Sequence, residues 1–380
     1  MDAEINNHVL RLARERINLD LVSASKKIGI SNPEILELAE KGERKITFKQ
    51  AERAAHVYDI PLAYFYFEDI PEDDFPLLDY RLHPDAVGKN LKPSLMKDIF
   101  KAIRRRDTIL ELSRELGSEQ KKFSLSCDLE NNPEEVGISV RSLLPINLFT
   151  PKSKRVSNVI DFFENEFGIY VVQVGGARHT KVDYEDFDGA AIYFDNLPII
   201  IINTHERGHN RQIFTLFHEL SHLMLKNRVI TDFYSGAETG ASQSIQSIET
   251  FCNKVSASVL VPQEQLLGTF DGENYSNLSN MFKVSREVVV IRLRNLGAIS
   301  QEKCDLLLKQ FQDEFLKSYR EKNSSSSSGP NPNTITLRNM GNLFTNIIRE
   351  SFSDGKISYY DAITELKLKD KPARAVLYGS

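Results

Sequence analysis

The chain has few cysteines and no long apolar run. Its 380 residues include three cysteines, Cys127, Cys252 and Cys304, which are far apart and form no CxxC pair. This number and spacing exclude a disulfide framework and a thiolate zinc site. The longest apolar run, 197–202, is far shorter than the roughly 20 residues that a membrane-spanning helix needs. We therefore expect no membrane span, and any metal ion must be held by histidines and carboxylates.

The chain also lacks a strong net charge and a secretion signal. The formal net charge of −5 at pH 7 is too small to indicate a class of partner. Residues 1–10 contain no basic stretch followed by an apolar segment, so we expect a cytoplasmic protein. Residues 81–106 hold eight Lys/Arg against two Asp. We interpret this basic run as the solvated face of a helix rather than as a surface that contacts phosphates or an acidic partner.

Breaks in the hydrophobic pattern divide the chain into parts. The predicted fold class is α+β and mostly helical, with a small sheet. A Ser-, Asn- and Pro-rich tract after Lys322 cannot form a core and predicts a flexible linker. The predicted parts are an N-terminal helical domain (1–70), a helical linker region (71–150), an α+β domain (151–322), the flexible linker (323–334) and a small C-terminal unit (335–380).

Periodicity predicts the elements within these parts. The N-terminal domain has the pattern of about five short helices. Alternating and β-branched residues predict strands within 169–174 and 190–203. Amphipathic patterns predict further helices at 95–116, 132–144, 156–167, 211–226 and 248–260, and two short helices within 278–296.

The segment 211–225 contains an HExxH motif in a strongly apolar helical context. At about 100° per residue, His218 and His222 lie one turn apart on one helix face, so two imidazoles can reach one ion. Zinc with an open position lowers the pKa of its water to about 7, and the adjacent Glu219 can accept the proton of that water. Burial of these residues among apolar neighbours is costly unless a metal compensates. The motif therefore predicts a Zn²⁺ site with Glu219 as the catalytic base, rather than a chance HExxH.

Two histidines leave such a site one protein ligand short. Since no histidine follows His222, a downstream ligand must be a carboxylate. Asp232 and Glu238 fall in a Gly/Ser/Thr-containing stretch that we expect to be a loop. Glu249 opens the predicted helix 248–260, which can pack beside the HExxH helix. Glu249 is therefore the preferred candidate of the three.

The HExxH segment, followed by Glu249-Thr-Phe-Cys-Asn253-Lys-Val-Ser-Ala-Ser-Val-Leu-Val-Pro262, resembles the ImmA/IrrE metallopeptidase family. That family pairs HExxH with a glutamate on the next helix, in the setting E-xxx-N-x-[FV]-[AS]-A-xx-L-x-P. The resemblance covers roughly 155–300. It implies a zincin-like domain, Glu249 as the third Zn²⁺ ligand, and a structural role for Asn253 and Pro262.

Two more sequence features bear on the resemblance to the ImmA/IrrE family. Ser221 stands where the family often has Gly, a change between small residues that should leave the ligands in place. Residues 77–81 read Leu-Leu-Asp-Tyr-Arg, and related sequences often carry such residues upstream of the peptidase region.

The family also implies a place for the substrate. In zincins a strand edge before the active-site helix binds the substrate as an added strand, and segment 190–203 occupies that place. The implied substrate-binding residues are Ile200, Ile201, Ile202 and Asn203; a role as core strand is equally compatible with the sequence. We interpret His205 and His209, in the polar turn 204–210, as loop residues rather than substrate contacts.

The first 66 residues resemble an Xre/Cro-type helix-turn-helix domain. Gly29 takes the turn position, and Ser31 is placed to cap a recognition helix that begins near Asn32. The basic residues available for the DNA backbone are Lys26, Lys27, Arg44 and Lys45.

The charges of the recognition helix disagree with this resemblance. The helix carries Glu34, Glu37 and Glu40 and no Lys or Arg, which opposes contact with phosphates. DNA binding and the docking of a protein therefore both remain open for this domain. A second helix-turn-helix-like stretch, 278–297, contains Arg286, Arg292 and Arg294, and we interpret it as structural rather than DNA-reading.

Members of the family cleave helix-turn-helix repressors and so release the genes that these silence. The resemblance implies a cytoplasmic, Zn²⁺-dependent regulatory endopeptidase whose substrate is a helix-turn-helix repressor or an antitoxin. The rival hypothesis is a DNA-binding regulator or antitoxin-like protein whose peptidase fold mainly mediates protein contacts.

Overall fold

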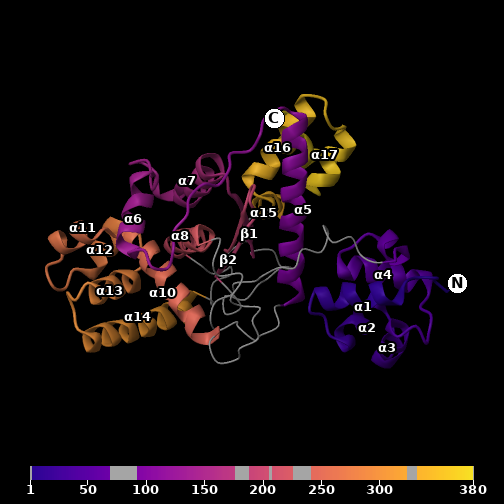
Figure 1. Cartoon of the computed structure of the whole chain (residues 1–380), viewed down its shortest axis with the longest axis horizontal. Helices are drawn as coiled ribbons and strands as arrows, with labels where there is room; N and C mark the ends of the chain where they lie inside the picture. The colour runs from indigo at the N-terminus through magenta and orange to yellow at the C-terminus, as the bar shows by residue number, and fades with distance from the viewer. Residues whose placement is uncertain are drawn as a thin grey trace.

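The computed structural model describes residues 2–68, 92–175, 188–204, 208–225, 241–322 and 332–379 (Figure 1). These residues are mostly helical and contain a three-stranded sheet, which confirms the predicted fold class. Residues 77–81, His205, Asp232 and Glu238 lie outside the described residues.

Residues 2–68 form an N-terminal bundle of short helices. They are α1 (Asn7–Arg16), α2 (Leu21–Ile28), α3 (Pro33–Glu40), α4 (Phe48–Tyr58) and the 3₁₀ helix η1 (Leu62–Tyr66). Arg14 donates from Nε and Nη2 to the two carboxylate oxygens of Glu40, at 2.7 and 2.8 Å. This buried ion pair joins α1 to α3. Glu40 therefore faces the interior, and only Glu34 and Glu37 contribute their charge to the outer face of α3.

The turn between α2 and α3 lies where the sequence predicts it. Gly29 has a φ of 83°, in the left-handed region that glycine adopts with little strain. The cap of α3 is Asn32, whose side chain accepts the N–H of Glu34 at 3.0 Å. Pro33 occupies the first helical position, where its missing N–H costs nothing. The prediction of Ser31 as the cap is therefore wrong by one residue.

The long helix α5 (Pro93–Glu115) connects the main parts of the molecule (Figure 1). Three consecutive arginines of α5 each donate to a different part of the chain. The bonds are Arg104 Nη2 to Asp59 at 2.7 Å, Arg105 Nη1 to the Asn339 carbonyl at 2.9 Å, and Arg106 Nε to the Leu197 carbonyl at 3.0 Å. The interpretation of this basic run as a solvated face is wrong for Arg105 and Arg106, which bind backbone carbonyls. Arg104 pairs with Asp59, but its side chain is 40% exposed.

The sheet consists of β1 (Tyr170–Val174), β2 (Gly189–Ile192) and β3 (Ile199–Asn203), in the order β1-β3-β2. β3 is parallel to β1 and antiparallel to β2, so both of its backbone edges are paired. All of its residues are buried. The prediction of a substrate-binding edge is therefore wrong for the residues that belong to this central strand, Ile200, Ile201, Ile202 and Asn203.

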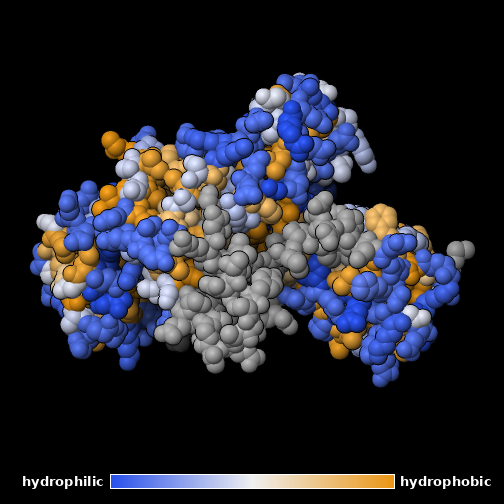
Figure 2. Space-filling view, viewed as in Figure 1, coloured by the Kyte–Doolittle hydropathy of each residue, from blue (hydrophilic) through white to orange (hydrophobic). Residues whose placement is uncertain are grey.

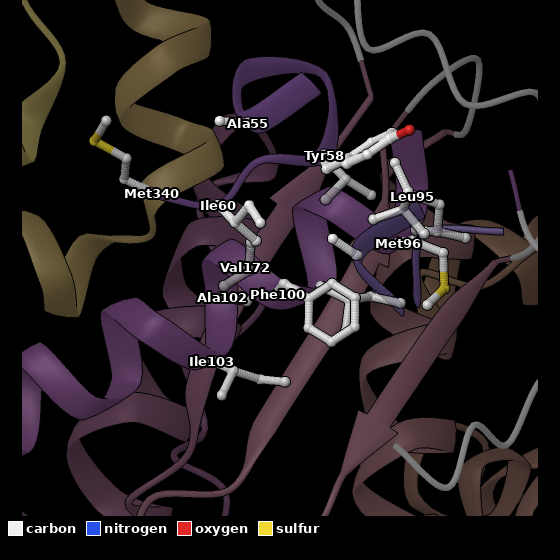
Figure 3. Packing of buried hydrophobic residues seen from close by; sticks show 14 of the residues in the cluster. Ala55, Tyr58, Ile60, Leu95, Met96, Phe100, Ala102, Ile103, Val172 and Met340 are labelled. Atoms are coloured by element: carbon white, nitrogen blue, oxygen red, sulfur yellow. The ribbon is translucent and has the colours of Figure 1, made fainter. Parts of the chain in front are cut away.

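Alternate residues of the sheet face two separate cores, as the two-residue period of a strand requires. Val172 and Ile201 pack into a core shared with the N-terminal bundle, α5 and the C-terminal helices. Val171 and Ile200 pack into a second core with helices that precede and follow the sheet. Figure 3 shows part of the first core, where side chains of α5 lie among those of α4 and β1.

The helices before and after the sheet contribute buried side chains to the second core. They are α6 (Pro133–Ser142), α7 (Arg155–Phe162) with its π-helical continuation η5 (Phe163–Phe167), α8 (His209–Met224), α10 (Ala241–Leu260), α11 (Gln263–Thr269), α12 (Tyr275–Phe282), α13 (Arg286–Asn295) and α14 (Gln301–Lys322). α8 packs against β2 and β3 and also against α10, which in turn packs along α6. The helices predicted in this region are therefore confirmed.

The arginines around α13 hold helices together. Arg292 is buried and pairs with Glu134 of α6, Arg286 pairs with Glu314 of α14 at 2.7 Å, and Arg294 donates to Gln301 at 3.0 Å. These contacts agree with the structural interpretation of the second helix-turn-helix-like stretch, which stays a prediction.

The C-terminal unit packs on β1 and α5. Its helices are α15 (Pro332–Met340), α16 (Asn342–Ser353), α17 (Tyr359–Leu366) and α18 (Asp370–Tyr378). Gly341 has a φ of 82°, and a Cβ there would lie 2.7 Å from the Val171 carbonyl oxygen, so the unit approaches the strand closely. Because α15 begins at Pro332, the predicted linker 323–334 overlaps a helix; residues 323–331 lie outside the described residues.

None of the described helices has both the length and the apolarity to cross a membrane. Figure 2 shows hydrophilic residues over most of the C-terminal unit, whereas apolar residues gather over α6 and α7. Exposed apolar side chains in and after α6 include Ile138, Leu143 and Ile146. Further exposed apolar side chains lie on other parts of the described chain, such as Val22, Leu306 and Tyr360.

Candidate metal centre

Helix α8 presents two histidines side by side. His218 and His222 lie one turn apart, and their Nε2 atoms are 3.1 Å from each other. Leu216, Phe217 and Leu220 on the other faces of α8 are buried in the second core. This packing fixes the rotation of the helix, so that the histidine face is presented to α10.

The third member of the group comes from α10. Glu249 Oε2 lies 3.1 Å from His218 Nε2, and Glu249 Oε1 lies 3.2 Å from His222 Nε2. Each residue offers one ligand atom, and these atoms all lie within 4.8 Å of one another. The structure therefore brings together the three side chains that the sequence analysis selected as metal ligands.

The charges of this group suit a divalent cation. Burial lowers the pKa of His218, but the hydrogen bond with Glu249 and the charge of Glu219 outweigh burial and raise it above its usual value. Burial also opposes the ionisation of Glu249, yet its bonds to both imidazoles hold its pKa well below the usual range. A carboxylate anion thus faces two imidazole nitrogens. Two histidines and one carboxylate form the ligand set of many catalytic zinc sites.

Glu219 lies beside the three candidate metal ligands. It is 4% exposed, and its Oε2 atom makes no hydrogen bond to any described residue. Burial raises the pKa of Glu219 to about 8; the charge of His218 opposes this, and those of Glu249 and Asp188 add to it. A carboxyl group with a pKa near neutral pH can both accept and release a proton. Glu219 therefore has the properties of a general base.

Strand β2 packs directly on the face of α8 that carries Glu219. A Cβ at Gly189 would lie 2.6 Å from Thr215 Cγ2 and 2.8 Å from Glu219 Oε1. Any other residue at this position must displace the strand or the glutamate. Gly189 could not be recognised in the sequence, because the approach of β2 to α8 is a tertiary contact.

An ion pair fastens the start of β2 to the first turn of α8. Arg211 donates to Asp188 from Nε at 3.2 Å and from Nη2 at 2.6 Å. Arg211, Thr215 and Glu219 follow one another at four-residue intervals and therefore share a helix face. The four-residue spacing of these three residues is visible in the sequence. The partner Asp188 is 23 residues upstream, and no local pattern singles it out.

Ser221, Asn253 and His209 lie close to the candidate metal ligands in the sequence. Ser221 is buried and donates to the Phe217 carbonyl at 2.8 Å, so it does not disturb the ligands. Asn253 contributes to the raised pKa of His218 through a side-chain hydrogen bond. His209 is an exposed residue at the start of α8, so its assignment to a loop is wrong, and it is not part of the metal-binding group.

The basic residues predicted to meet DNA are all exposed on the N-terminal bundle: Lys26, Lys27, Arg44 and Lys45. Lys26 and Lys27 lie in the last turn of α2. Lys45 forms an ion pair with Glu4, which occupies part of its charge. DNA binding by these residues stays a prediction.

Residues 166–294 match the family model of the IrrE N-terminal-like domain, Peptidase_M78. The match covers about one third of the chain and includes the sheet, α8 and α10, with His218, Glu219, His222 and Glu249. No curated protein matches the chain. The family match supports the resemblance to ImmA/IrrE proteins and a metallopeptidase type of function.

Proposed function

We propose that the protein is a zinc-dependent endopeptidase. The observation that carries this proposal is the convergence of His218, His222 and Glu249 beside the buried Glu219. When bound, zinc supplies a water of lowered pKa and polarises the substrate carbonyl. Glu219 accepts the proton of the attacking water and passes it to the leaving amine. The two imidazoles favour zinc over Mg²⁺ and Ca²⁺, which prefer oxygen ligands.

The second edge of β2 is the proposed place for the substrate backbone. Within the described residues β2 pairs with β3 on one side only, and Gly189 lies against Glu219. An extended peptide added to this edge gains backbone hydrogen bonds that depend little on its side chains. Recognition of one target protein therefore needs a further contact, for which the N-terminal bundle is available.

The proposed substrate is a helix-turn-helix repressor or an antitoxin in the cytoplasm. Cleavage of such a protein would release the genes that it silences. The exposed Glu34 on α3 favours docking of a basic protein surface by the N-terminal bundle. The half-buried Glu37 contributes less, because it pairs with Lys41 at 2.6 Å. The alternative function, a DNA-binding regulator, is supported by the helix spacing around Gly29 and by the exposed Lys26 and Lys27.

The test is cleavage of the repressor or antitoxin encoded beside this gene, with mass spectrometry of the products. We expect discrete cuts by the zinc-loaded full chain and a rate about 10²–10⁴-fold lower for Glu219→Gln, because this variant keeps the ligands but lacks the base. Equal cleavage by both proteins would exclude Glu219 as the base.

The same variant separates the two functions. If Glu219→Gln regulates the target promoter as well as wild type does, proteolysis is not the function. The alternative also predicts a promoter shift that weakens with salt and with the double variant Lys26→Gln and Lys27→Gln.

A further inference from the structure

A cavity lies between the N-terminal bundle and α5, on the side of the sheet away from α8 and α10. Its volume is about 310 Å³, at the lower end of the range of small-molecule sites. The residues that line it with charged, polar or ring-containing side chains are Arg16, His56, Asp59, Pro61, Tyr64 and Arg104. It shares no residue with the metal centre.

Two guanidinium groups of the cavity are held in place by the packing of the bundle on α5. The Arg16 guanidinium carbon lies 3.6 Å from the centroid of the Phe100 ring. Arg104 Nη2 donates to Asp59 Oδ2 at 2.7 Å, and these side chains are 40% and 26% exposed. Both cations are thus positioned in advance and accessible from the cavity, which lowers the entropy cost of binding an anion.

Among the described residues around this cavity, cations outnumber carboxylates. Burial raises the pKa of Asp59, but the charges of neighbouring cations outweigh it and hold the pKa below its usual value. These cations are Lys101, Arg104 and Lys367. Burial and nearby cations also lower the pKa of Lys97 and Lys367. A second carboxylate, Asp98, pairs with Lys101 at 3.3 Å.

We propose that this cavity binds a small organic phosphate, of the size of a nucleoside monophosphate. The forked donors of Arg16 and Arg104 match the oxygens of a phosphate, and a dianion offsets more of the excess charge than a carboxylate does. Pro61 and Tyr64 form the wall for its less polar body. The ligand contacts α1, α4 and α5 together and so tightens the N-terminal bundle on α5.

Calorimetric titration of the full chain tests this site. Adenosine 5′-monophosphate binds with one molecule per chain, inorganic phosphate binds more weakly, and adenosine does not bind. Arg104→Gln and Arg16→Gln each weaken the affinity for adenosine 5′-monophosphate by about tenfold or more, because each removes charge-assisted hydrogen bonds. Arg114→Gln, at an exposed position farther along α5, is the matched control and keeps the wild-type affinity.

The proposal has clear contrary outcomes. It is overturned if the folded wild-type chain binds neither phosphate compound. It is also overturned if either folded arginine variant keeps the wild-type affinity for adenosine 5′-monophosphate. A DNA duplex that binds wild type and is lost in Arg104→Gln, with no binding of the nucleotide, would assign the cavity to a nucleic-acid backbone instead. Thermal unfolding of each variant shows whether it has folded.

Discussion

Glu219 has almost no free space on the side of β2. Its Oε1 atom would lie 2.8 Å from the Cβ of any side chain at residue 189. Ordinary contacts of a Cβ are longer, so either the strand or the carboxylate would have to move. The glycine is therefore part of the arrangement that positions the proposed base.

Gly189→Ala should lower the free energy of unfolding by about 1–3 kcal/mol, because it overpacks a buried contact. It should also reduce peptidase activity more than zinc affinity, because the displaced residue is Glu219 and not a ligand. Denaturant unfolding and zinc titration measure the two effects. Gly268→Ala in α11, where a Cβ meets nothing within 4 Å, is the control and should be neutral or slightly stabilising. If both substitutions behave alike, the close approach of β2 has no consequence.

At the residue scale, the sequence predicts the site residues best where a single helix carries the whole motif. His218, Glu219 and His222 are fixed by their spacing on α8, and the absence of later histidines leads to a carboxylate such as Glu249. Asp188 and Gly189 could not be predicted, because their importance arises from a strand that packs on α8 from a distant part of the chain.

At the element scale, Glu164 joins three elements. It lies in the π-helical turn η5 and accepts the N–H of Val171 in β1 at 3.4 Å. A further backbone hydrogen bond comes from Leu343 in the first turn of α16. Burial raises the pKa of Glu164 to about 8, against the effect of these two bonds. The folded chain therefore retains a proton that the unfolded chain releases near pH 4.5.

Glu164 should make the free energy of unfolding fall as pH rises from about 4.5 to about 8. In this window the folded state binds more protons, so raising the pH favours unfolding. At 1.36 kcal/mol per pKa unit, the effect is on the order of a few kcal/mol. Urea unfolding of Glu164→Gln across this range should show a smaller slope than wild type. Glu166→Gln, in the same turn but exposed, is the control, and an equal slope in both variants would contradict this role.

The helices were more predictable than the sheet. α5, α8 and α10 carry amphipathic periodicity within their own residues, and even the two-helix reading around Ser285, the cap of α13, is correct. The sequence does not decide between Ser31 and Asn32 as the cap of α3, because both residue types are good N-caps. The central position of β3 could not be predicted, because strand order depends on pairing between distant segments.

At the scale of the whole molecule, α5 holds the parts together. Arg104, Arg105 and Arg106 bind the N-terminal bundle, the C-terminal unit and the segment before β3, respectively. Consecutive residues on a helix point about 100° apart, so three neighbours can reach three directions. The charges of these arginines are visible in the sequence, but tertiary packing sets their partners. The basic run 81–106 therefore has the sequence pattern of a solvated helix face.

Arg106→Gln should destabilise the chain by about 1–3 kcal/mol, because it leaves two partly buried carbonyl groups without their donor. Arg106 donates to the carbonyls of Asn196 and Leu197 and lies 3.9 Å from the centroid of the Phe194 ring. Thermal unfolding should show the loss, and Arg114→Gln should melt as wild type does. Equal melting of both variants would mean that α5 does not depend on this contact.

The most direct test of the metal centre is the zinc content of the purified full chain, measured by mass spectrometry after dialysis against trace free zinc. The account predicts about one zinc per chain for wild type and for Glu219→Gln, since the base is not a ligand. It predicts a large loss of zinc for His222→Ala and for Glu249→Ala, each of which removes one of three ligands. Absence of zinc from wild type, or full occupancy in Glu249→Ala, would contradict the proposed centre.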